Sequence, residues 1–474
     1  MSFAALERLV GRDQVLTGAA ALLPFESDGL THFRARPRAV VLPGTTEQVA
    51  AVVRWCVETG TPFVPRGAGT GLSGGALPCA TGVVIELARL NRILEVRARD
   101  RVARVQCGVV NAELSAALRP LGLHYAPDPS SQTACTLGGN VAENSGGPHT
   151  MKYGTTTDHI LGLKVVLPDG EISELGGPLA GRPGLDLVGH FVGSEGTFGI
   201  ATELWVRLTP NPAVVRTFLF AFADLDAACR MVSRIVADGI LPAALEMLDR
   251  QTIQVVEASV LRAGYPTDAE AVLLVELDGS APQVDDDARR VRAIGADAGA
   301  FETREATSAE ERLKLWKGRK GAFGALGRLS PDLYVQDAVV PRSKLPEILR
   351  QVRQIATEER IRLSNVFHAG DGNLHPNISY DGRDHDEVAR VVRAGDRILK
   401  ACLAVGGSLS GEHGIGMEKR DSMALLFAPA DLDVFARVRH AWNPLGLCNP
   451  DKVLPGTKVC VEFRPGVTIE GVTH

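Results

Sequence analysis

The sequence lacks the features that direct a protein to nucleic acid or into a membrane. Lys and Arg are dispersed along the 474 residues and the net charge is −5, so no nucleic-acid partner is expected. No uncharged apolar stretch reaches the roughly 18 residues that a transmembrane helix needs. The first 25 residues have no basic start followed by an apolar run, which argues against a signal peptide.

The eight cysteines are scattered, and no two of them have the spacing of a Cys-x-x-Cys pair. This excludes a zinc ribbon and gives no support for an iron–sulfur cluster held by this chain. Isolated thiols are typical of a reducing compartment. We therefore expect a cytoplasmic protein, attached to the inner membrane only through partner subunits if at all.

Glycine, in contrast, is abundant at 50 residues and clusters in a few segments. The chain is too long for one hydrophobic core, which rarely exceeds about 300 residues. A Pro-rich boundary is expected at 209–212, after which predicted strands alternate with helices. These patterns predict an α+β protein with parts at 1–212 and 213–407, and a helical C-terminal segment at 408–474.

Local sequence patterns predict the positions of a helix, a loop and several strands. Residues 45–48 have the sequence of a capping box at the start of a helix. Residues 126–154 are crowded with Pro, Gly, Ser and Asn, which predicts a long functional loop. In the second part, strands are expected at 217–222, 271–277, 334–340 and 362–367.

The first glycine cluster, PRGAGTGLSGG at 65–75, is interpreted as a diphosphate-binding loop. It lacks the Lys-Ser/Thr pair of a P-loop. Gly69, Gly71 and Gly74 match the bare dinucleotide pattern, but Pro78 and a predicted strand follow, where a Rossmann loop must open a helix. A nest of backbone N–H groups between two strands remains. The candidate contacts are Pro65, Arg66, Gly67, Ala68, Gly69, Thr70, Gly71, Ser73 and Gly74.

Two further segments, 127–154 and 193–200, combine glycines with small polar residues. With the first loop, they resemble the vanillyl-alcohol oxidase-type (PCMH-type) FAD-binding family, especially the FAD-linked subunits of bacterial glycolate oxidases. D-lactate and D-2-hydroxyglutarate dehydrogenases resemble the chain more distantly. The resemblance implies a two-part FAD-binding domain at 1–212, a cap domain with an antiparallel sheet, and a C-terminal segment that returns to complete the active site.

The resemblance also implies which residues contact FAD. Some relatives attach the flavin through a His in the first loop or a Cys in the second segment. Residues 65–75 contain neither, and Cys135 lies outside the Gly-Gly stretch, so noncovalent FAD is expected. The further contacts implied are Pro129, Ser130, Thr133, Gly138, Gly139, Asn140, Asn144, Ser145, Gly147, Gly196, Ile200 and Asn449.

A second constellation lies in NVFHAGDGNLHPN (365–377) and SGEHGIG (410–416). Two imidazoles and one carboxylate are the composition of an open catalytic divalent-metal site. Any one of these histidines alone is more typical of a hydrogen-bonded interior residue. The resemblance implies that His368, His375 and Glu412 bind a metal, zinc or manganese. It implies His413 as the general base and Asn377 as a substrate contact.

These residue types suit the oxidation of a 2-hydroxy acid, which takes a hydride from Cα to flavin N5 and a proton from the hydroxyl. A divalent metal lowers the pKa of that hydroxyl. An imidazole with an ordinary pKa of about 6.5 then accepts the proton. Arg319, on a predicted helix, matches the carboxylate-binding arginine of the family. Lys317 and Lys320 are expected to form a solvated face of that helix.

Residues 334–337 lack the basic residue that the 2-hydroxyglutarate enzymes carry there. This departure favours glycolate or D-lactate, with D-2-hydroxyglutarate as the alternative substrate. Electrons must pass to a separate acceptor, and the resemblance implies iron–sulfur partner subunits; a homodimer stays open. Two other classes also stay open: a zinc hydrolase without flavin, and a non-catalytic flavin-binding subunit.

Overall fold

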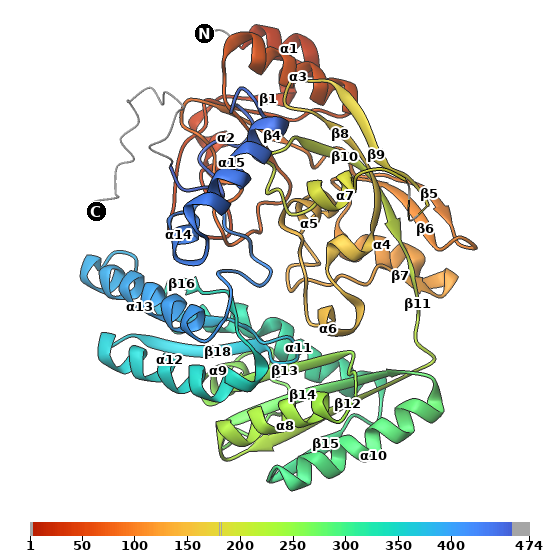
Figure 1. Ribbon diagram of the computed structural model, residues 1–474, viewed down its shortest axis with the longest axis vertical. Helices are drawn as coiled ribbons and strands as arrows, with labels where there is room; N and C mark the ends of the chain where they lie inside the picture. The colour runs from red at the N-terminus through yellow and green to blue at the C-terminus, as the bar shows by residue number, and fades with distance from the viewer. Residues whose placement is uncertain (1–2, 180, 182, 457–474) are drawn as a thin grey trace.

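The computed structural model describes residues 3–179, 181 and 183–456, so Cys460 and the end of the predicted segment 408–474 lie outside the described residues. Figure 1 shows two parts stacked along the long axis. The last helices, α14 (Met423–Leu426) and α15 (Pro429–Trp442), return to the upper, N-terminal part. Among the described residues, no helix is both long and apolar enough to cross a membrane.

The upper part contains two main sheets. One has the strand order β1 (Val15–Leu16), β2 (Ala39–Val41), β4 (Val83–Glu86), β3 (Phe63–Arg66). The other is antiparallel, with the order β5 (Ile93–Arg97), β6 (Val102–Gln106), β10 (Ile200–Arg207), β8 (Ile160–Val166), β9 (Ile172–Gly176). A short pair joins β7 (Leu123–His124) to β11 (Thr209–Pro210). The helices here are α1 (Ala4–Val10), α2 (Ala19–Leu22), α3 (Thr46–Thr59), α4 (Asn111–Leu118), α5 (Leu137–Glu143), α6 (Thr150–Tyr153) and α7 (Leu187–Phe191).

The glycine loop connects β3 to its parallel neighbour β4. No helix occurs between these strands, all of whose connecting residues are described, so the Rossmann interpretation is correctly excluded. The predicted cap of α3 is present, since Thr45 Oγ1 accepts the N–H of Gln48 at 3.2 Å. Gln48 Oε1 accepts the N–H of Gly44 rather than that of Thr45, so the box closes one residue early.

The lower part is built on a nine-stranded sheet within the described residues. Its strands are β12 (Val214–Phe222), β13 (Ala244–Asp249), β14 (Ala271–Gly279), β15 (Glu302–Glu305), β16 (Asp332–Val335), β17 (Ala338–Val339), β18 (Arg362–His368), β19 (Asn373–Leu374) and β20 (Pro376–Tyr380). All pairings are antiparallel, as expected for the cap.

Side chains alternate between the two faces of the cap sheet, and helices bury both faces. In β12, Phe218, Phe220 and Phe222 lie in one core, while Leu219 and Ala221 lie in the other. The first core is closed by α8 (Leu225–Ala237), α10 (Ala281–Asp297), α12 (Leu345–Glu359) and α13 (His385–Ala404). The second is closed by α9 (Arg250–Glu257) and α11 (Ala309–Leu326).

Two local expectations are wrong. Residues 126–154 are not one loop, because α5 and α6 occur within them. Gly138 and Gly139 have low helix propensity, so the sequence did not predict α5. Thr136 caps this helix by accepting the N–H of Gly139. Residues 334–340 do not form one strand: β16 pairs with β20 and β17 with β19, and the buried polar pair Gln336-Asp337 lies between them.

Candidate active site

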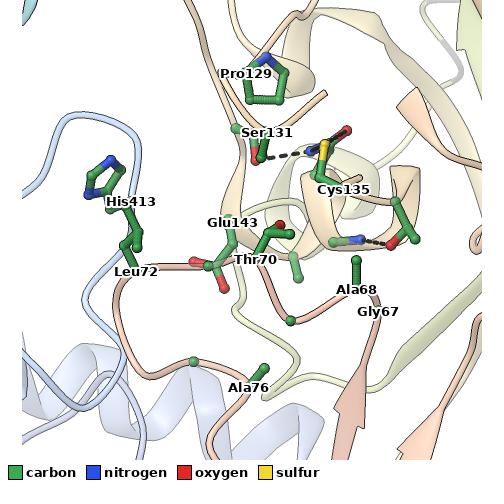
Figure 2. Close-up of a pocket in the computed structure, with 18 of the residues that line it drawn as sticks. Gly67, Ala68, Thr70, Leu72, Ala76, Pro129, Ser131, Cys135, Glu143 and His413 are labelled. Carbon is green, nitrogen blue, oxygen red and sulfur yellow. Dashed lines mark hydrogen bonds between the residues drawn. The ribbon is translucent and has the colours of Figure 1, made fainter. Parts of the chain in front are cut away.

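A cavity of about 390 Å³ lies between the two parts, within the usual range for ligand sites of about 300–1,000 Å³. Figure 2 shows that the glycine loop, the second segment and the C-terminal loop all reach it, represented by Gly67, Cys135 and His413. Residues more than three hundred positions apart therefore face the same space.

At Gly67 and Gly69 the wall formed by the glycine loop must be backbone, because a side chain would not fit. Gly69 has φ of 67°, and a Cβ there would lie 2.2 Å from Arg66 Nη2. A Cβ on Gly67 would lie 2.3 Å from Thr136 Oγ1. Arg66 itself is committed to neighbours, since Nη1 donates to the carbonyl of Ala76. A backbone cradle of this kind suits a diphosphate.

Most of the residues expected to contact FAD line this cavity. They are Pro65, Arg66, Gly67, Ala68, Gly69, Thr70, Gly71, Pro129, Ser130, Gly138, Gly139, Asn140, Ser145, Gly196, Ile200 and Asn449. They come from β3, the glycine loop, α5 and the loops on either side of it, the turn into β10, and the C-terminal segment.

Five expected contacts lie away from the cavity wall: Ser73, Gly74, Thr133, Asn144 and Gly147. Ser73 is fully buried, and its carbonyl oxygen accepts the N–H of Met417. Asn144 ends α5 in the left-handed conformation, and its Oδ1 accepts the N–H of Thr157. Thr133 is exposed. The roles of these five toward FAD stay predictions.

Two acids that sequence reasoning did not assign, Glu143 and Glu195, lie on the cavity wall. Burial, and then the neighbouring Glu195, raise the pKa of Glu143 well above its usual value. Glu143 Oε2 and Ser194 Oγ are buried without a hydrogen-bond partner among the described residues. Unpartnered polar atoms beside a glycine cradle fit a ligand rich in hydrogen-bonding groups, such as FAD.

The three expected metal ligands converge. His368 ends β18, His375 lies between β19 and β20, and Glu412 follows α13 on the C-terminal loop. The Nε2 atoms of both histidines lie 3.2 Å from Glu412 Oε1. Their ligand atoms all lie within 4.8 Å of one another. Two imidazoles and a carboxylate so arranged fit a divalent cation.

Glu246, in β13, is a further member of this cluster. It is fully buried, with Oε1 2.8 Å from His368 Nδ1 and Oε2 2.5 Å from Arg319 Nη2. A carboxylate on the outer nitrogen fixes the ring of a metal-binding histidine. The burial of His368 opposes its protonation, but Glu246 and Glu412 outweigh this and raise its pKa well above the usual value. The only signal in the sequence was an acid inside an apolar run.

His413 stacks on His375, with ring centroids 4.9 Å apart. Burial lowers the pKa of His413 to about 4, although Asp337 opposes that shift. The expectation of an ordinary imidazole pKa is therefore wrong. At pH 7 the ring is neutral, which is the form that accepts a proton, while the lower pKa also makes it a weaker base.

Arg319 and Asn377 also line the cavity. Asn377 lies in β20 and donates through Nδ2 to the carbonyl of His375. Lys317 is exposed, as expected. Lys320 is not on a solvated face: it lines the cavity, and its Nζ lies 3.0 Å from Asp128 Oδ2.

Comparison with known proteins identifies the class. Residues 37–176 match the family described as FAD binding domain, and residues 211–453 match FAD linked oxidases, C-terminal domain. The chain therefore belongs to the FAD-linked oxidases. This membership confirms the FAD-linked oxidoreductase inferred from the sequence, over the hydrolase and the non-catalytic subunit.

Individual relatives agree along nearly the whole chain. Glycolate oxidase subunit GlcD of Escherichia coli (strain K12) is 46% identical over 450 residues, which cover 95% of this chain and 90% of that protein. A D-lactate dehydrogenase of Anaerostipes hadrus is 33% identical over 93% of this chain and 94% of that protein. The structure of p-cresol methylhydroxylase with substrate bound superposes with a TM-score of 0.79 at 19% identity, covering 95% of each chain. The last match confirms the expected PCMH-type fold.

Proposed function

We propose that this chain oxidises a small D-2-hydroxy acid, glycolate or D-lactate, to the 2-oxo acid. One observation carries the proposal: a single cavity is lined both by the glycine cradle and by His375, Glu412 and His413. Two relatives of the chain are named glycolate oxidase subunit GlcD and D-lactate dehydrogenase. In this proposal residues 1–212 hold the cofactor, 213–407 bind the substrate, and 408–474 complete the site.

Noncovalent FAD, when bound, would accept at flavin N5 the hydride that leaves the substrate Cα. The backbone of the glycine loop would hold its diphosphate, and the small residues of α5 would admit the flat ring. His413, neutral at pH 7, would take the hydroxyl proton. Arg319, with Nε unpartnered among the described residues, would bind the substrate carboxylate.

A divalent cation, zinc or manganese, on His368, His375 and Glu412 would supply the positive charge that lowers the pKa of the substrate hydroxyl. The charges around the site favour it. Glu246, Glu412 and Asp337 face the cations Arg319 and Lys419. Burial opposes a charge on His368, but Glu246 and Glu412 raise its pKa well above the usual value, so the cluster favours positive charge at that ring. A dication would supply that positive charge in place of the proton on His368.

One observation favours the diacid alternative, D-2-hydroxyglutarate. Lys320 lies on the cavity wall, where a distal carboxylate would meet it. Its Nζ is paired with Asp128 and lies 5.7 Å from the ring centroid of Trp316, so its charge is already engaged. We therefore keep the monocarboxylic acids as the proposed substrates.

The test is anaerobic titration of the purified protein with glycolate, D-lactate and D-2-hydroxyglutarate, following flavin absorbance. Bleaching by a monocarboxylic acid at the lowest concentration is the expected result. Bleaching by the diacid alone would overturn the substrate choice, and no bleaching by any of them would overturn the reaction. A yellow pellet after acid precipitation would contradict noncovalent attachment.

Electrons are proposed to leave for a separate acceptor. Among the described residues, the groupings of side chains that could bind a metal contain no cysteine, so they offer no iron–sulfur ligation. The Escherichia coli relative is named as a subunit of glycolate oxidase. We propose iron–sulfur partner subunits as the acceptor, and copurification with them or a stand-alone homodimer are the outcomes to distinguish by size-exclusion chromatography.

A further inference from the structure

The loop that carries Glu412 and His413 lies between the two parts of the molecule, where the chain passes from α13 to α14 (Figure 1). It has no regular secondary structure over residues 410–416. Buried backbone N–H groups need hydrogen-bond partners. The partners of these amides therefore determine whether the loop is held in one conformation.

The first amides of the loop all reach one atom, Asp337 Oδ2. That atom accepts hydrogen bonds from the N–H groups of Gly411 at 2.9 Å, Glu412 at 3.2 Å and His413 at 3.0 Å. It also accepts from Ser410 Oγ at 2.6 Å. Asp337 is completely buried in the cap, between β16 and β17.

The remaining amides reach a second carboxylate in the other part. Glu195 Oε1 accepts the N–H of Ile415 at 2.8 Å, and Oε2 accepts that of Gly416 at 2.6 Å. Between the two sets, the N–H of Gly414 donates to Ser410 Oγ at 2.9 Å. Every amide from Gly411 to Gly416 therefore donates to a side-chain oxygen.

The conformation of the loop requires glycine at position 414. Gly414 has φ of 88°, and a Cβ there would lie 2.4 Å from Glu143 Oε2 and 3.0 Å from Glu195 Oε1. The free oxygen of the first carboxylate also points at the site, since Asp337 Oδ1 lies 3.8 Å from His375 Nδ1. Asp337 thus touches the backbone of Glu412 and His413 and faces the ring of His375.

We propose that Asp337 and Glu195 are positioning residues that clamp the loop from opposite parts of the molecule, and so set the places of Glu412 and His413. The inference rests on the proposed function for its meaning, but the clamp itself is a property of the fold. A displacement of about 1 Å in a catalytic group costs about 100-fold in turnover.

The test compares Asp337→Asn with Asp249→Asn. Asp249 is a matched control, because it is also a buried cap aspartate with four hydrogen bonds, to the amide and hydroxyl of Thr252 and to the backbone and side-chain nitrogens of Asn365. It makes no hydrogen bond to residues 410–416. Asp337→Asn should lower kcat about 100-fold with cation and substrate saturating, while FAD content stays unchanged. Asp249→Asn should stay within about 2-fold of the wild type.

Hydrogen exchange of the peptide containing Gly411–Gly416 gives a readout that does not depend on turnover or on a metal. Asp337→Asn and Glu195→Gln should each speed exchange there about 10-fold or more, and Asp249→Asn should not. Ser410→Ala is the milder variant should Asp337→Asn fail to fold. Unchanged exchange in the clamp variants, or a kcat loss equal to that of Asp249→Asn, would overturn the proposal. An inactive wild type with a protected loop would overturn the proposed function and leave the clamp standing.

Discussion

The two ends of the cavity are built from different materials. The proposed cofactor end is mostly backbone: glycines between β3 and β4 and along α5, with Arg66 already bound to neighbouring residues. The proposed catalytic end is side chain: imidazoles and carboxylates from the cap sheet and from the loop after α13, most of them buried. A backbone cradle depends on the absence of side chains from the cavity. The catalytic end depends on side chains that the fold must bring together. Substitutions at the two ends should therefore fail in different ways.

The largest expected effect is at the catalytic end. His413→Asn should lower kcat/KM about 1,000-fold, because general-base catalysis contributes about 100- to 10,000-fold. FAD content, read from the ratio of absorbance at 450 and 280 nm, should be unchanged. Steady-state kinetics with the preferred 2-hydroxy acid measures the effect. Turnover close to that of the wild type would remove His413 from the mechanism.

The next effect tests the cation. Glu412→Gln replaces a charged ligand by a neutral one of the same shape and should weaken zinc or manganese binding about 100-fold. Isothermal titration of chelator-treated protein measures it, and added cation should restore activity to the wild type but not to the variant. If chelation leaves both cation content and turnover of the wild type unchanged, the metal assignment is wrong.

At the cofactor end, Gly69→Ala should reduce FAD affinity about 10-fold, through backbone strain at φ of 67° and contact with Arg66. Activity at saturating FAD should recover, which separates a cofactor defect from a catalytic one. Gly18→Ala is the control, because a Cβ there meets no atom within 4 Å and φ is −70°. Equal FAD retention in both variants would show that the cradle tolerates side chains.

The smallest expected effect is at the interface between the two parts of the molecule. His149 lies 2.9 Å from Asp128 Oδ2 and 3.2 Å from Glu276 Oε1 in the cap. Burial opposes its charge, but these acids outweigh burial and raise its pKa to about 10. Its contribution to stability is therefore complete below pH of about 6.5 and is lost as pH rises through about 10.

His149→Gln should accordingly cost about 2 kcal/mol at pH 6, with the gap to wild type closing near pH 10. Differential scanning calorimetry across that range measures it. His124→Gln is the control, since burial lowers the pKa of His124 and its Nδ1 pairs with the neutral amide of Asn211 at 2.9 Å. A constant gap between His149→Gln and wild type would contradict the ion-paired imidazolium.

The accuracy of the predictions from sequence differed between kinds of element. Apolar strands were located closely: those expected at 217–222 and 271–277 lie within β12 and β14. α5 was missed because Gly138 and Gly139 are poor helix formers, and tertiary contacts outweigh that preference. β13 was missed with it, and so was Glu246, since an acid inside an apolar run gives no sign of the histidine it will meet.

The sequence alone determined the glycine loop at 65–75. Its glycines and the proline that follows depend on local backbone geometry, which is encoded within a few residues. It also supplied His368, His375, Glu412 and His413, the residue types from which we inferred the chemistry. Only the tertiary structure decided their environment: the pKa of about 4 at His413, the carboxylates of Glu246 and Asp337, and the cavity shared with the glycine loop. Burial and charge at one residue are set by neighbours that distant segments bring, and no local pattern encodes them.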